Sequence, residues 1–131
     1  MEGRRFELCV LPGRFAVCRL QPSSPIPAWL PERGFVSVTR TADELSVVCE
    51  ESCVPVGVKA QAGWVVMALR GPFEFSEVGV LASLAEPLAK AGIGIFVIST
   101  FDTDYLLVAQ ENLDRTVAAL TSAGHTIERA V

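Results

Sequence analysis

The sequence predicts an α+β fold: an open sheet with helices on one face, and strand–helix–strand–strand–helix–strand (βαββαβ) order in the second half of the chain. Three observations support this class. Half of the 131 residues are apolar, which is enough for a buried core. Two stretches in the second half have apolar residues at helical spacing, and strand-length apolar runs flank them. Residues 36–51 and 96–111 also resemble each other at a shift of sixty positions, which indicates a duplicated unit.

The first half of the chain is predicted to consist of strands, turns and one loop. The run from Gln21 to Pro27 holds three prolines and two serines, a composition that favours a loop. Residues 26–31 have room for at most one helical turn. Alternation of apolar and polar residues at 35–39 predicts a strand with one buried face. With three short apolar runs, this gives four predicted strands, at residues 6–11, 15–20, 35–39 and 45–49.

The second half is predicted to combine strands with two helices. Its strands are expected at residues 64–69, 93–100, 105–109 and 126–130. The first helix is expected over 76–90 with Ser76 as its N-cap, and its apolar stripe consists of Val78, Leu81, Ala85 and Leu88. Pro87 predicts a kink or an irregular last turn in this helix. The second helix is expected to be capped by Asn112 and to carry the stripe Leu113, Val117 and Leu120.

Composition and charge argue against several classes of protein. The net charge is −4 and the chain has no basic patch, which disfavours nucleic acid as a partner. The longest apolar stretch, residues 93–98, is far shorter than the roughly 20 residues of a membrane span, so we expect a cytoplasmic protein without a membrane partner. Cys9, Cys18, Cys49 and Cys53 are expected to be reduced thiols. Zinc binding by Cys49, Cys53 and His125 is a weaker alternative, because no second closely spaced pair of ligands exists.

Four segments carry a resemblance to a known family. They are SEVGV at 76–80, AGI at 91–93, ISTFDTDYLLV at 98–108 and ELSVV at 44–48. This series resembles the ACT-domain group of aspartokinase regulatory regions and of the eukaryotic cytosolic arginine sensors, and most of all its small bacterial stand-alone members. The resemblance implies two ferredoxin-like ACT units, residues 1–60 and 61–131, that share one antiparallel eight-stranded sheet with helices on one face. The first unit departs from the pattern because it lacks a normal helix.

The resemblance also implies a binding site. An amino acid would bind at the junction of the two units, against the first helical turn of the second unit and the turn between its second and third strands. In this chain those positions are Phe73, Ser76, Glu77, Val78, Gly79, Val80, Thr100, Phe101, Asp102 and Asp104.

The chemistry of these residues fits such a ligand. A helix start offers bare N–H groups to a carboxylate, and the two aspartates offer partners to a cation. Ordinary turn chemistry also explains an aspartate such as Asp102, and dipole stabilisation also explains Glu77.

The function expected from these residues is an amino-acid-binding regulatory domain, or sensor, with no cofactor and no metal. The acidic residues hint weakly at a basic amino acid, and a partner enzyme or a homodimer is a further expected partner. Catalysis is not expected: successive turn residues such as Asp102 and Asp104 rarely face each other across a scissile bond, and Gly92-x-Gly94 precedes a strand instead of a helix. The alternative is a protein–protein docking module that binds no ligand and acts on a partner enzyme.

Overall fold

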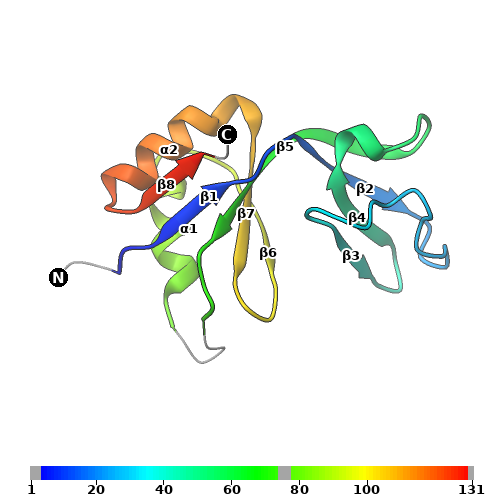
Figure 1. Ribbon diagram of the computed structural model, residues 1–131, viewed down its shortest axis with the longest axis horizontal. Coiled ribbons are helices and arrows are strands. Elements are labelled where there is room, and N and C mark those ends of the chain that lie inside the picture. The colour runs from blue at the N-terminus through cyan, green and yellow to red at the C-terminus, as the bar shows by residue number, and fades with distance from the viewer. Residues whose placement is uncertain (1–3, 74–77, 130–131) are drawn as a thin grey trace. The chain divides into compact units, whose positions relative to one another are not determined.

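The computed structural model describes residues 4–73 and 78–129 of the chain. In these residues it has eight strands and two α-helices, which confirms the predicted α+β class (Figure 1). The chain forms two compact units. The helical unit combines the N-terminal segment up to Pro12 with the chain from Val65 onwards, and the strand unit consists of Gly13–Trp64. The predicted boundary between residues 60 and 61 lies inside strand β5 (Lys59–Leu69), to which both units contribute.

The helical unit follows the predicted βαββαβ order and adds one strand to it. After β5 come α1 (Val80–Lys90), β6 (Phe96–Ser99), β7 (Asp104–Ala109), α2 (Leu113–Ser122) and β8 (Thr126–Arg129). The added strand is β1 (Glu7–Val10), and the strand order is β6-β7-β5-β1-β8. Because β1 and β8 both run antiparallel to β5, they pair in parallel, so the sheet is mixed and not wholly antiparallel as predicted.

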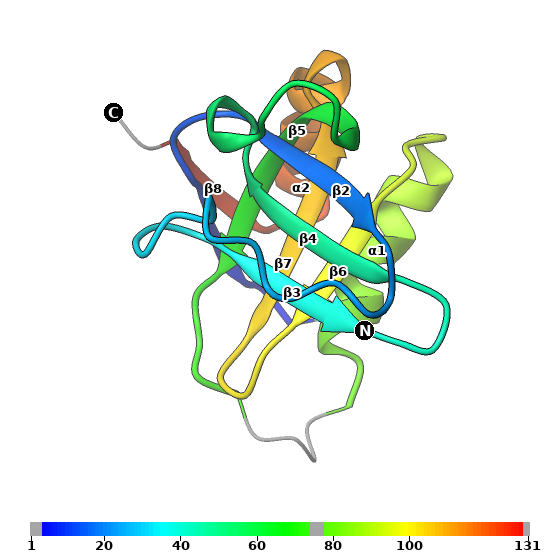
Figure 2. The same ribbon diagram turned by 90° about the vertical axis from the view of Figure 1, so that its right-hand side faces the viewer.

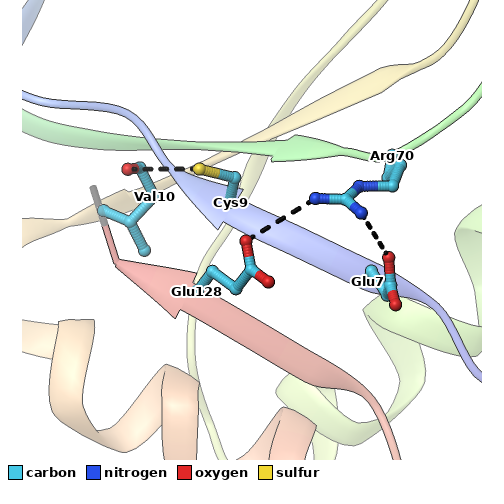
Figure 3. A network of polar contacts seen from close by, with 5 residues as sticks. All are labelled: Glu7, Cys9, Val10, Arg70 and Glu128. Atoms are coloured by element: carbon cyan, nitrogen blue, oxygen red, sulfur yellow. Dashed lines mark hydrogen bonds and ion pairs between the residues drawn. The ribbon is translucent and has the colours of Figure 1, made fainter. Parts of the chain in front are cut away.

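A surface ion-pair network spans the inserted strand (Figure 3). The guanidinium of Arg70, just after β5, lies 3.0 Å from the carboxylate of Glu7 on β1. It also lies 3.6 Å from the carboxylate of Glu128 on β8. All three side chains are exposed, so the network adds little stability, but it joins the ends of three adjacent strands.

The core of the helical unit lies between its sheet and its two helices. Side chains on one face of β5 alternate with those on the other, so Val65, Met67 and Leu69 point the same way. They pack with residues of β1, β7, α1 and α2 in one cluster that also includes Leu8, Val10, Leu84, Leu88, Leu106, Val108 and Leu120. Burial of each such side chain contributes about 1.5–3 kcal/mol, which makes this cluster the main source of the unit's stability.

Helix α1 differs from its prediction in both start and phase. It begins at Val80, and its N-cap is Gly79 and not the predicted Ser76. Its buried residues are Val80, Leu84 and Leu88, whereas Val78 is 89% exposed. The segment VLASLAEPLA is apolar at nearly every position, so its periodicity fits two stripes, and packing against the sheet selects one of them.

The strand unit contains β2 (Phe15–Leu20), β3 (Ser37–Arg40), β4 (Leu45–Glu50) and the first half of β5. Its strand order is β3-β4-β2-β5, and all three pairings are antiparallel. Ala16, Cys18, Leu45 and Val47 form its buried cluster. Residues 13–64, all of which the structure describes, contain no α-helix.

The two units repeat one hairpin, with a register that corrects the predicted one. In the β3–β4 hairpin Arg40 lies opposite Leu45, and in the β6–β7 hairpin Ser99 lies opposite Asp104. The equivalent residues are therefore 59 positions apart, and the predicted shift of sixty is wrong by one. A one-residue slip places each strand residue on the other face of the sheet, which is why the predicted pairs do not match.

Candidate functional site

The β6–β7 bend, residues 100–103, holds three of the ten predicted site residues, Thr100, Phe101 and Asp102, and Asp104 follows as the first residue of β7. The Thr100 amide donates to the Thr103 carbonyl over 2.8 Å, and the Thr100 hydroxyl donates to the same oxygen over 3.1 Å. At the base of the bend, the Ser99 hydroxyl donates to Oδ1 of Asp104 over 2.5 Å. The half-buried Asp104 carboxylate is thus fixed across the hairpin, with its other oxygen available to a further donor.

The segment between β5 and Phe73 lies against this bend. The amide of Phe73 donates to the carbonyl of Asp102 over 2.8 Å, and the hydroxyl of Thr103 donates to the carbonyl of Leu69 over 2.7 Å. Gly71 permits the close approach, because a Cβ there would lie 3.0 Å from the backbone oxygen of Asp102. The structure therefore brings Phe73 and the bend together.

Helix α1 starts at the same end of the helical unit as this bend (Figures 1 and 2). Gly79 has φ of +83°, a conformation that glycine adopts without strain. The first intrahelical bond runs from the amide of Ser83 to the carbonyl of Gly79, so the amides of residues 80–82 have no partner within the helix. These amides and the positive end of the helix dipole favour an anionic group.

The predicted site residues differ in what they offer to a ligand. Val80 is buried in the core, which leaves its backbone amide as the group it can present. Val78 and Phe101 are 89% and 78% exposed, and Asp102 is also exposed. Ser76 and Glu77 lie outside the described residues. Two residues that sequence reasoning missed, Gly71 and Thr103, hold the bend against the β5 side.

A third missed residue is His125, which the sequence analysis considered only as a ligand in the alternative zinc site. It is 4% exposed. The amide of Phe6 donates to its Nδ1 over 3.1 Å, and its Nε2 lies 3.0 Å from the carbonyl oxygen of Ser83. Both ring nitrogens therefore have partners in the protein. Pro87 indicates from the sequence that the carbonyl of Ser83 lacks its helical donor, but it does not indicate that His125 is the residue that contacts it.

The cysteines behave as buried or half-buried thiols. Burial raises the pKa of the Cys18 thiol, and burial, followed by the charges of Cys18 and Cys53, raises the pKa of the Cys49 thiol to about 11. A raised pKa keeps a thiol protonated, whereas a metal ligand must be a thiolate. Among the described residues, no group of three or more histidine, cysteine and acidic side chains is placed to hold a metal ion. In the same residues, no helix has both the length and the apolar character to cross a membrane.

Comparison with known proteins identifies the family. A model of the ACT domain matches residues 59–122, and a second family model, of an N-terminal domain, matches residues 13–57. A solved structure of a protein from Agrobacterium tumefaciens is 44% identical, with a TM-score of 0.93, over 98% of this chain and 96% of that chain. The regulatory subunit of aspartate kinase from Thermus thermophilus shares the fold, with 14% identity and a TM-score of 0.59 over 86% of this chain and 93% of that one.

One curated relative covers only part of the chain. The Homo sapiens protein named cytosolic arginine sensor for mTORC1 subunit 1 is 36% identical over 58 residues. These residues are 44% of this chain, and they span only 18% of the length of that relative. The ACT model and the relatives agree with the observed βαββαβ order of the helical unit, and the chain belongs to the ACT-domain family.

Proposed function

We propose that this chain is a regulatory domain that binds a free amino acid at the end of the helical unit where the β6–β7 bend meets residues 69–73 and α1 begins. One observation carries the proposal: the hydrogen bonds Phe73–Asp102 and Thr103–Leu69 hold an acidic bend beside the segment that leads into α1. The name of the partial relative, an arginine sensor, supports a basic amino acid as the first ligand to test.

Each group of an amino acid has a chemical counterpart at this end of the helical unit. The carboxylate fits the amides at the start of α1, which have no partner within the helix. The ammonium fits the carboxylate of Asp104, which keeps one oxygen available beyond its bond to Ser99. A hydrogen bond to a charged group contributes roughly 1.5–3 kcal/mol. A micromolar site needs about 8 kcal/mol, which corresponds to about three to five such bonds.

Isothermal titration calorimetry of the full chain against the twenty amino acids, with L-arginine first, tests the proposal. We expect at least one amino acid to bind, and Asp104→Asn to weaken its affinity tenfold or more by removing the charge while keeping the shape. Asp114→Asn is the matched control, because it removes an exposed carboxylate of the same unit that pairs with Arg129 and lies outside the proposed site. Full affinity in Asp104→Asn would refute the site.

Asp102 is tested against its counterpart in the other hairpin. Asp43 occupies the equivalent bend position 59 residues earlier, and both aspartates are exposed. If Asp102 binds the ligand, Asp102→Asn weakens affinity and Asp43→Asn does not. If both variants change the affinity equally and only slightly, Asp102 stabilises the turn and does not bind the ligand.

A docking module is the second candidate, favoured by the exposure of Val78 and Phe101 at this same end. Such a module would use these apolar side chains and would have no need of the Asp104 charge. No heat and no thermal shift with any of the twenty amino acids would support docking over sensing.

A further inference from the structure

Pro87 creates an unusual requirement in the middle of α1. A helical residue normally donates its amide to the carbonyl four positions earlier, but proline has no amide hydrogen. The carbonyl of Ser83 therefore loses its helical partner. Nε2 of His125 lies 3.0 Å from this oxygen and, since a carbonyl only accepts, the histidine must be the donor.

The other ring nitrogen of His125 has the opposite role. The backbone amide of Phe6 donates to Nδ1 over 3.1 Å, so Nδ1 carries no proton. The two bonds together require the neutral ring with its proton on Nε2. The ring also stacks on that of Phe6, with centroids 5.7 Å apart and planes at 20°. A buried ring with both nitrogens bonded has a fixed position and tautomer.

The two residues that bond to the ring of His125, Phe6 and Ser83, each contact a residue of the proposed binding end. On one side, the ring of Phe6 packs edge-on against that of Phe73 at 5.7 Å, and Phe73 is bonded to the bend through Asp102. On the other side, the amide and the hydroxyl of Ser83 both donate to the carbonyl of Gly79, over 3.0 and 2.8 Å. The chain of contacts thus runs from the bend through His125 to Gly79, the N-cap of α1.

We propose, resting on the amino-acid-binding function argued above, that His125 is a positioning residue which sets the spacing between Phe73 and the start of α1. It touches no ligand. Its Nε2–H holds α1 by the carbonyl that Pro87 leaves open, and its Nδ1 holds the segment around Phe6. Loss of the hydrogen bond at either nitrogen therefore moves Phe73 and the start of α1 relative to each other.

Three variants separate the two contacts. His125→Asn retains an acceptor near the Nδ1 position for Phe6, and His125→Gln retains a donor near the Nε2 position for Ser83. Pro87→Ala returns an amide to α1, so that the helix itself satisfies Ser83. Thr116→Val is the control, because Thr116 is fully buried in the same unit and its hydroxyl donates to the carbonyl of Asn112 within its own helical segment.

The first measurement needs no ligand. Long-range proton–nitrogen spectra of the full chain should show neutral His125 with its proton on Nε2. His125→Asn should shift the amide resonances of Gly79 and Ser83, and Thr116→Val should leave them in place. A proton on Nδ1, or unmoved Gly79 and Ser83 resonances, would overturn the proposal whether or not any amino acid binds.

The second measurement uses the amino acid that binds the wild type, with L-arginine as the first probe. We expect His125→Asn to lose about fivefold in affinity, the scale of one hydrogen bond, and Thr116→Val to lose less than twofold. Adding Pro87→Ala to His125→Asn should recover most of the loss, which a merely structural histidine would not show. Failure of the wild type to bind any amino acid refutes the proposed function, and failure of the rescue alone refutes the role of His125.

Discussion

Gly71 lies at a tight contact in the proposed binding end. A Cβ on residue 71 would lie 3.0 Å from the backbone oxygen of Asp102, 3.1 Å from Cβ of Thr103 and 3.2 Å from Cδ2 of Phe73. Backbone and a β-branched side chain cannot rotate out of the way. Gly71→Ala must therefore push residues 69–73 and the bend apart.

The cost of this substitution follows from two effects. Overpacking of a tight contact costs about 1–3 kcal/mol. Lengthening the hydrogen bond between the amide of Phe73 and the carbonyl of Asp102 adds about 1 kcal/mol. We expect Gly71→Ala to lower the free energy of unfolding by about 2–4 kcal/mol in urea denaturation, and to weaken amino-acid binding because the bend moves.

Gly94→Ala is the matched control. A Cβ there meets open space among the described atoms, and the φ of Gly94 is not in the left-handed region. Alanine at such a position is neutral or stabilises by about 0.4–1 kcal/mol, mainly by restricting the unfolded chain. If both variants unfold at the same urea concentration, the bend does not pack against Gly71 as described.

Three further substitutions test separate features. Gly79→Ala should cost about 1–2 kcal/mol in urea denaturation, because φ of +83° strains any residue with a Cβ; a cost below that of Gly94→Ala would argue against this conformation. Arg70→Ala should cost less than about 1 kcal/mol and the difference should shrink in 1 M salt, since its ion pairs are exposed. Burial raises the pKa of the Cys49 thiol from 9.0 to about 11, so the folded state keeps a proton that the unfolded state releases. Stability should therefore fall as the pH rises from 9 through 11, and less steeply in Cys49→Ala.

The order of elements could be predicted because most strands and both helices have local signals. The predicted bounds of a strand were wrong where the strand is formed by pairing with a neighbouring strand and its side chains are not buried. β5 begins at Lys59, five residues before the predicted Trp64, because its first half pairs with β2 while its side chains there are exposed. The insertion of β1 between β5 and β8 had no local signal, since nothing in residues 6–11 specifies a partner so distant in the sequence.

In the candidate site too, features with a local sequence signal could be predicted, and features that depend on residues distant in the sequence could not. The acidic bend was predictable from the turn residues at 100–104, and the structure fixes Asp104 through Ser99. The start of α1 was placed wrongly because Ser76 matches the preference for a cap better than Gly79 does. The role of His125 depends on residues 119 and 42 positions away, so no local pattern could reveal it.

The register of the repeated hairpin leads to a last prediction, on stoichiometry. In the strand unit, Thr41 repeats the bend geometry of Thr100, with its amide donating to the carbonyl of Glu44 over 2.9 Å. At the position of Asp104, however, the first hairpin has Leu45, which is fully buried, and residues 13–64 offer no α-helix start. A duplicated site would lack both its cation partner and the amides of a helix start. Calorimetry should therefore give one amino acid per chain, and two equivalent sites would show that the Asp104 carboxylate and the α1 amides are not what binds the ligand.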